Sequence, residues 1–185
     1  MPILKRESDI FPETLFELDD ADRLWRVAHV KSRQEKVLAR YLLERNIPFY
    51  LPQTEQTTKR SGRTFKSYTP LFGGYVFVRT IKEDTLTIRR SEVIANLIDV
   101  HDQHQLQEEL HQLHRLQQSG ALLVPYPELT VGDKVRVTEG VFKGYEGLIV
   151  REKGDTRLVV SISMLRQSVA AEFGRESIAP ARKVA

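Results

Sequence analysis

Residues 70–79 read PLFGGYVFVR, which is typical of a β-strand that is apolar on both faces. Side chains alternate along a strand, so Tyr75, Phe77 and Arg79 point to one face, opposite to the two intervening valines. Such a strand needs cover on both sides, supplied by its own domain or in part by a partner protein. The stretch therefore predicts a strand that needs cover on both of its faces.

The sequence before this strand predicts a second strand, a helix and a hairpin. WRVAHV at 25–30 alternates as a strand does, and SRQE at 32–35 is a capping box that predicts the start of a helix. The helix ends before Pro48, and FYLPQTEQTTKR and TFKSYT then predict two strands joined by an exposed tip at 59–63. The apolar stripe of the helix consists of Val37, Leu38, Tyr41 and Leu42.

The sequence after residues 70–79 predicts further helices and strands. EDTLTIRR at 83–90 indicates a short helix, VIANLIDV at 93–100 a strand, and residues 103–118 a longer helix. Four short strands with Gly-rich turns then follow between residues 134 and 173, which favours a small closed or nearly closed barrel. The longer helix carries a seam formed by Leu106, Leu110, Leu113 and Leu116.

Two segments lack any regular period. Residues 1–23 hold 7 Asp and Glu against 3 Lys and Arg, and they predict a poorly ordered acidic leader. Residues 119–130 contain Gly120 and two prolines, which predicts an interdomain linker. We therefore expect one domain at 24–118 and a second domain at 131–182.

The composition excludes several classes of protein. The 185 residues include no cysteine, so disulfide scaffolds and thiolate chemistry are excluded. The apolar runs are far shorter than the ~20 residues of a membrane-spanning helix, and the N-terminus has no signal-peptide pattern. Motifs of nucleotide-binding loops, nucleophile elbows and zinc peptidases are also missing from the sequence. We expect a cytoplasmic monomer that is not an enzyme and needs no cofactor.

Basic charge is concentrated in one part of the chain. Residues 24–80 hold 11 Lys and Arg against 3 Asp and Glu. Such a surface attracts a phosphate backbone, and Tyr41 or Tyr50 would stack on an unpaired base, although Tyr41 also fits the helix core. A solvated basic face without a partner is the other interpretation. The candidate nucleic-acid contacts are Lys31, Arg33, Arg40, Arg45, Lys59, Arg60 and Arg63.

Three histidines form the best candidate for a metal site. His104, His111 and His114 fall on one side of the helix predicted at 103–118. That side lies opposite the leucine seam, so solvent-facing histidines without a metal are the stronger interpretation.

Two independent stretches resemble the NusG family of transcription elongation factors. PLFGGYVFV, preceded by WRVAHVKSRQEKVLARYLLERNIPFYLP, is similar to the family's N-terminal domain. VGDKVRVTEGVFKGYEGLIV is similar to its C-terminal KOW domain, a small SH3-like barrel. The resemblance spans about residues 24–180 and presents the two parts in the family's order. It implies an α+β fold, in which the N-terminal domain has an antiparallel sheet flanked by helices.

The resemblance implies a docking site for RNA polymerase. Family members bind the clamp helices of the largest polymerase subunit through an apolar pocket, and Phe72, Tyr75 and Phe77 match its aromatic positions. We expect at least one of the three to fill the core instead. The opposite edge of the domain approaches the polymerase gate loop and suppresses pausing. The corresponding residues here are Thr85, Thr87, Arg89 and Arg90.

The resemblance also implies contacts with DNA and with a further protein. VKSRQEK and VTEGVFKGYEG are closest to the specialised RfaH-like paralogs, which act as antiterminators and contact the non-template DNA strand. The KOW domain binds ribosomal protein S10 or the termination factor Rho, and the β-branched LVVSIS favours strands over the helical form that RfaH also adopts. A housekeeping NusG-type factor and a translation-side adaptor are the alternatives. The expected KOW contacts are Phe142, Ile162, Met164 and Leu165.

Overall fold

The computed structural model describes residues 8–60, 62–126, 134–136, 143–152, 155–172 and 182–183. It divides into two compact units, Met1–Gln103 and His104–Ala185, here called the N-terminal and C-terminal units. This division falls at the start of the helix that the sequence predicts at 103–118. The domain boundaries expected from the sequence stay a prediction.

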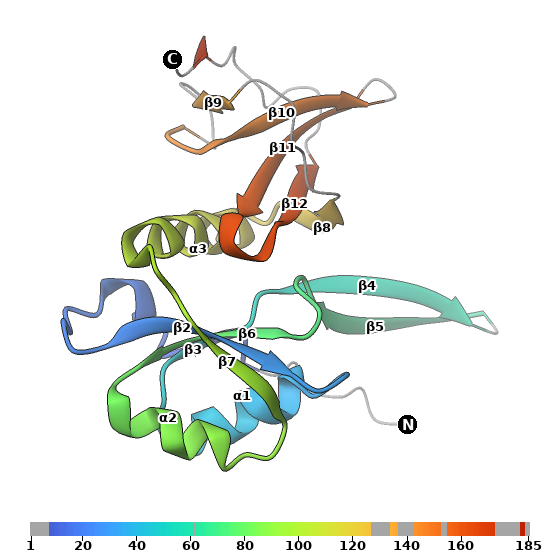
Figure 1. Ribbon diagram of the computed structural model, residues 1–185. Helices are drawn as coiled ribbons and strands as arrows, with labels where there is room; N and C mark the ends of the chain where they lie inside the picture. Colours follow the sequence, from blue (N-terminus) through green and yellow to red (C-terminus); the bar gives the residue numbers. More distant parts are fainter. Residues whose placement is uncertain are drawn as a thin grey trace. The chain divides into compact units, whose positions relative to one another are not determined.

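The N-terminal unit contains a five-stranded antiparallel sheet in the order β1-β3-β6-β2-β7 (Figure 1). Strand β6 lies in the middle of this sheet, and its Val76, Phe77 and Val78 are all fully buried, as expected for a strand that is apolar on both faces. Aliphatic and aromatic side chains suit such a pleated, buried surface. The strands are β1 (Ile10–Phe11), β2 (Leu24–Val30), β3 (Phe49–Tyr50), β6 (Tyr75–Thr80) and β7 (Ile94–Asp99).

Helices α1 (Glu35–Leu43) and α2 (Lys82–Arg89) lie on the same side of this sheet (Figure 1). The sequence predicted both helices and the strand that became β7. The aliphatic core on this side joins buried residues of the helices to one face of the sheet. Its members include Ala28, Leu38, Ala39, Leu42, Phe49, Val76, Val78 and Ile88.

The start of α1 differs from the prediction. The expected capping box at 32–35 does not form: the helix begins at Glu35, Gln34 is its N-cap and makes no side-chain cap, and Arg33 has a φ of +59°. The Glu35 carboxylate instead accepts a hydrogen bond from the Gly74 N–H at 2.7 Å. Val37, which was assigned to the apolar stripe, is 37% exposed.

The hairpin predicted after α1 is confirmed. Strands β4 (Gln53–Arg60) and β5 (Arg63–Pro70) pair antiparallel as a separate two-stranded sheet. Arg60 pairs with Arg63, which leaves two residues in the loop. The second loop residue, Gly62, has a φ of +73°, a backbone conformation that residues with a Cβ rarely adopt.

The structure of the acidic leader differs from the sequence prediction. Residues 8–23 are not a poorly ordered tail: β1 pairs with β3, and the short 3₁₀ helix η1 (Leu15–Glu17) buries Leu15 completely. The segment lacks a period because it contributes only a few apolar side chains, and these are buried by contacts with residues distant in the sequence.

The C-terminal unit contains helix α3 (Gln103–Gln118), whose first residue belongs to the N-terminal unit, and a six-stranded antiparallel sheet. All four leucines of the predicted seam are buried. The sheet order is β13-β9-β10-β11-β12-β8. Its elements are β8 (Leu122–Tyr126), β9 (Lys134–Arg136), β10 (Glu146–Glu152), β11 (Asp155–Ile162), η2 (Ser163–Leu165), β12 (Gln167–Glu172) and β13 (Arg182–Lys183).

Two expectations for this unit need correction. Part of the predicted linker at 119–130 is strand β8, which pairs with β12. In the described residues β13 and β8 end an open order of strands, so the predicted closed barrel is not confirmed. Strand β11 approaches β10 closely at Gly147, where a Cβ would collide with the Val159 carbonyl oxygen. No helix among the described residues is both long and apolar enough for a membrane span.

Candidate functional site

The sheet face opposite α1 and α2 is rich in aromatic residues. The register pairs Val27 with Phe77 and His29 with Tyr75, and β3 adds Tyr50 beside Phe77. Since the neighbouring valines of β6 belong to the helix-side core, these residues point away from the helices. We call this the aromatic face, and it comprises Trp25, His29, Tyr50, Phe72, Tyr75 and Phe77.

The three polymerase candidates differ in exposure. Phe72 and Phe77 pack edge to face with ring centroids 5.8 Å apart, and they are 1% and 0% exposed. Tyr75 is only partly buried and stacks on the exposed His29 with centroids 5.1 Å apart. Sequence reasoning missed His29, although the alternation of WRVAHV places it on this face. Tyr75 and His29 therefore form the accessible part of the candidate site.

The N-terminal segment covers the other end of the aromatic face. Phe16 stacks on Trp25 with centroids 5.9 Å apart and meets Tyr50 edge to face at 5.4 Å. The Arg79 guanidinium donates hydrogen bonds to the carbonyl oxygens of Leu15 and Asp20. Burial, and secondarily the charge of Asp9, raise the pKa of the Tyr50 phenol. Tyr50 is thus a buried neutral residue, which excludes base stacking in this structure.

The cations between β2 and α1 lie near the hairpin. Lys31 and Arg33 are exposed, and the Lys31 ammonium donates to the Glu92 carbonyl oxygen at 2.6 Å. Lys36 of α1 donates to the carbonyl oxygen of Tyr68 on β5 at 2.6 Å, which links the helix to the base of the hairpin. The structure therefore brings the first turn of α1 next to the base of the hairpin, whereas Lys31 contacts the residues before β7.

The cations in the second half of α1 have a different setting. Arg40 and Arg45 are exposed, but the Arg45 guanidinium lies 3.5 Å from the Tyr41 ring centroid and donates to the Tyr41 carbonyl oxygen. The Tyr41 hydroxyl donates to the Thr87 carbonyl oxygen at 2.9 Å. Tyr41 therefore bridges the two helices and packs against the core, which favours the packing role over base stacking.

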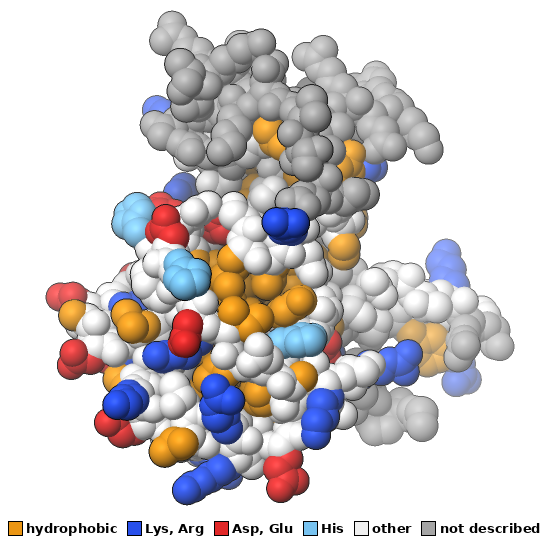
Figure 2. All heavy atoms as spheres, in the orientation of Figure 1, with side chains coloured by type: hydrophobic (Ala, Val, Ile, Leu, Met, Phe, Trp, Pro, Cys, Tyr) orange, Lys and Arg blue, Asp and Glu red, His pale blue; other side chains and the backbone are white. Residues whose placement is uncertain are grey.

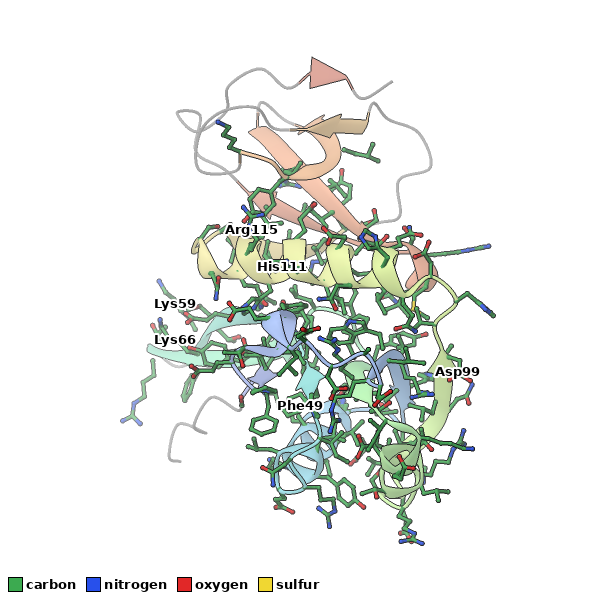
Figure 3. The ribbon with its side chains drawn as sticks, turned by 90° about the vertical axis from the view of Figure 1, so that its left-hand side faces the viewer. Phe49, Lys59, Lys66, Asp99, His111 and Arg115 are labelled. Carbon is green, nitrogen blue, oxygen red and sulfur yellow. The ribbon has the colours of Figure 1, made fainter. Side chains whose placement is uncertain are left out.

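The hairpin carries exposed cations on both strands. Lys59 and Arg63 are exposed, and Figure 3 shows Lys59 and Lys66 on this hairpin. Lys66 forms an ion pair with Glu55 at 2.8 Å. Phe65, which the sequence analysis did not single out, is 50% exposed. Arg60 lies opposite Arg63 in the register, and its side chain lies outside the described part of the chain.

The gate-loop candidates lie on α2 and at its C-terminal end. Thr85 and Thr87 are partly buried, whereas Arg89 and Arg90 are exposed. The Thr85 hydroxyl donates to a carbonyl oxygen of its own helix at 2.6 Å. The two arginines are therefore the members of this set with the most accessible charge.

The KOW candidates lie at the end of β11 and in η2. Ile162 is 1% exposed and fills the core, whereas Met164 is 37% exposed and Leu165 is partly buried. The Ser163 N–H and hydroxyl donate to the Glu109 carboxylate of α3 at 3.0 and 2.6 Å, which fixes η2 within its unit. Phe142 lies outside the described residues.

Arg115 of α3 contacts the aromatic ring of Tyr145 in the same unit. Its guanidinium lies 4.7 Å from the ring centroid, and Figure 3 labels it on α3. Burial raises the pKa of the Tyr145 phenol, while the Arg115 charge and hydrogen bond oppose the rise. This pair stabilises the C-terminal unit internally.

The three histidines of α3 do not form a metal site in the described structure. His104 is exposed, His111 and His114 are partly buried, and the His114 Nε2 lies 3.0 Å from the Gln118 side-chain nitrogen. Within the described ranges, no group of three or more His, Cys, Asp or Glu residues is placed to hold a metal ion.

Comparisons with known proteins point to one family. A family model described as "Transcription termination factor nusG" matches residues 23–116, just over half of the chain. A solved structure titled "Domain interaction in Thermotoga maritima NusG" is 20% identical with a TM-score of 0.43, over 80% of this chain and 92% of that one. A search of curated proteins gave no match. The assignment therefore rests on the family match.

Proposed function

The chain belongs to the NusG family of transcription factors, and from this premise we propose that it is an elongation factor that suppresses pausing and termination. We place its contact with the RNA polymerase clamp helices on the aromatic face. Phe72, Tyr75 and Phe77 are the proposed residues. This function requires no catalytic group.

The stacked pair of partly buried Tyr75 and exposed His29 carries the proposal. An aromatic side chain that is half-buried on a sheet, stacked on an exposed histidine, offers apolar area without disturbing the core. Phe72 and Phe77 pack beside it and fix the shape of the face. Tyr75 thus makes the direct contact, and the two phenylalanines position it.

The exposed cations support a second contact, with the non-template DNA strand. Lys66 of the hairpin is paired with Glu55, whereas the side chains of Lys31, Arg33 and Arg63 are exposed. Cations on such a surface neutralise phosphates and release counterions. Arg40, Arg45, Lys59 and Arg60 extend the proposed DNA surface.

Two further contacts complete the proposal. Arg89 and Arg90, with Thr85 and Thr87, face the polymerase gate loop. The C-terminal unit recruits S10 or Rho, and exposed Met164 is its best-placed contact. Leu165, Ile162 and Phe142 are the other proposed members of that patch.

The experiment compares the full chain with its Tyr75→Ala variant in a pull-down with core RNA polymerase and an in vitro elongation assay. We expect Tyr75→Ala to lose polymerase binding and pause suppression while its circular dichroism spectrum stays unchanged. Leu43→Ala is the matched control, because Leu43 is 39% exposed on α1, across the sheet from the aromatic face. Wild-type affinity in Tyr75→Ala would refute the assignment of the clamp contact.

A further inference from the structure

The two faces of the β4–β5 hairpin differ in charge and chemistry. Paired residues of an antiparallel ladder point to the same side, so the register separates the side chains into two sets. We call them the Phe65 face and the Glu55 face. The described side chains of the Phe65 face include Gln56, Thr58, Arg63, Phe65 and Ser67. Those of the Glu55 face include Glu55, Thr57, Lys59, Thr64, Lys66 and Tyr68.

The single acidic side chain of the Glu55 face contacts two side chains of the same face. Glu55 is the only acidic residue in the hairpin sequence, and its carboxylate pairs with Lys66 at 2.8 Å. The same carboxylate accepts a hydrogen bond from the Tyr68 hydroxyl at 3.1 Å. Lys66 therefore already has a carboxylate partner, and it lies on the opposite side of the hairpin from Phe65.

The Phe65 face has the opposite character. It contains no acidic residue, and its named side chains are all exposed. Phe65 lies two residues from Arg63 on the same strand, with Thr58 opposite it, and half of its surface is accessible. Figure 2 shows Lys and Arg side chains close to a hydrophobic side chain on the hairpin, at the right of the view.

We propose that the Phe65 face of the hairpin binds single-stranded DNA, with Phe65 stacking on an unpaired base and Arg63 contacting the adjacent phosphate. An acid-free cationic surface complements a phosphodiester backbone, and an accessible aromatic ring supplies the stacking platform typical of single-strand binding. Bases inside a duplex are already stacked, so the ring selects an unpaired strand. Thr58, Ser67 and Gln56 add hydrogen-bonding groups beside the ring.

This inference rests on the proposed function, since the DNA strand in question is the non-template strand of the transcription bubble. It adds the residue that reads the base and the face of the hairpin that meets the strand. It also separates the cations of the hairpin: Arg63 lies on the binding face, whereas Lys59 and Lys66 lie on the opposite one. Lys59 is therefore assigned at most a peripheral role in the proposed DNA surface.

The test measures binding of the full chain to a fluorescently labelled single-stranded DNA by anisotropy. Phe65→Ala is expected to weaken binding by about 5- to 100-fold, the range typical of losing one stacked base. Phe65→Trp is expected to retain affinity, and its added tryptophan emission is expected to be quenched on binding. Lys66→Gln, on the Glu55 face, is the matched control and is expected to bind as the wild type does.

Salt titrations separate stacking from charge. Arg63→Gln is expected to reduce the slope of log affinity against log salt by about 0.7, the value for one phosphate contact on a single strand. Phe65→Ala is expected to leave the slope unchanged because it removes no charge. Equal losses in Phe65→Ala and Lys66→Gln, unchanged affinity in Phe65→Ala, or no binding by the wild type would overturn the inference.

Two further measurements identify the ligand and distinguish a failure of this inference from a failure of the proposed function. Tighter binding to RNA or to duplex DNA of the same sequence would overturn the assignment to single-stranded DNA. Polymerase pull-downs of the same variants test the proposed function on its own. Stacking on DNA without polymerase binding would refute the proposed function alone, and polymerase binding without a Phe65 effect on DNA would refute this inference alone.

Discussion

The five-stranded sheet and the β4–β5 hairpin belong to the same unit, but they use aromatic side chains in opposite ways. Phe49 of β3 is fully buried in the helix-side core, whereas Phe65 of β5 is 50% exposed. Burial removes apolar surface from water and stabilises the fold, while an exposed ring contributes little to it. The sheet therefore holds the structure together, and the hairpin is free to present its side chains to a partner.

The same substitution in the two regions gives the largest expected difference. Phe49→Ala is expected to destabilise the N-terminal unit by about 3–5 kcal/mol, because it opens a cavity in the core. Phe65→Ala is expected to change the free energy of unfolding by less than about 0.5 kcal/mol. Urea unfolding followed by the fluorescence of Trp25, the single tryptophan and 2% exposed in the sheet, measures both. Similar losses in the two variants would remove the contrast between the regions.

The N-terminal segment extends the comparison to the other face of the sheet. Leu15 is fully buried and its neighbour Phe16 packs against Trp25 and Tyr50, so Leu15→Ala is expected to cost about 2–5 kcal/mol. The same urea titration measures this loss in the free energy of unfolding. Glu13→Ala, at an exposed position of the segment, is the control and is expected to have no effect. An unchanged midpoint in Leu15→Ala would restore the prediction of an independent leader.

Much of the fold could be predicted from local pattern. The alternation of PLFGGYVFVR placed Tyr75 and Phe77 opposite two valines, and the leucine spacing of α3 identified its buried side. The hairpin tip at 59–63 followed from its polar, glycine-containing sequence. These features are set by short-range periodicity, which a single sequence contains.

The features that sequence reasoning missed depend on partners distant in the chain. Glu35 was assigned to a capping box, but its carboxylate bonds Gly74, 39 residues away. Leu15 is buried although the segment around it has no period. The face of the hairpin on which each cation lies required the register, because a shift of one residue exchanges the two faces.

The hydrogen bond between Glu35 and Gly74 links α1 to the turn before β6. Its loss is expected to destabilise the unit less than the loss of a buried side chain. Glu35→Ala leaves the Gly74 N–H without its carboxylate acceptor and is expected to destabilise the unit by about 1–3 kcal/mol. Glu44→Ala on the same helix is the control, because the Glu44 side chain is 73% exposed and its loss is expected to fall within about 0.5 kcal/mol. Equal effects of the two variants, measured by urea unfolding, would contradict a structural role for the Glu35 bond.

The smallest effect is expected in the hairpin, at the ion pair of Lys66 and Glu55. The hydrogen bond and the charge of Glu55 raise the pKa of the Lys66 ammonium above its ordinary value of 10.5. The contribution of this pair to stability is therefore fully present below the ordinary pKa and is lost as the pH rises through the raised pKa. Glu55→Gln is expected to lower the Lys66 pKa toward 10.5 without moving the unfolding midpoint at neutral pH, because exposed ion pairs add little to stability. The shift in the Lys66 pKa is measured by following the lysine side-chain NMR signals against pH in the wild type and in Glu55→Gln. An unchanged Lys66 pKa would mean that the pair does not persist in solution, and Lys66 would then join Lys59 as an exposed cation of the Glu55 face without a carboxylate partner among the described residues.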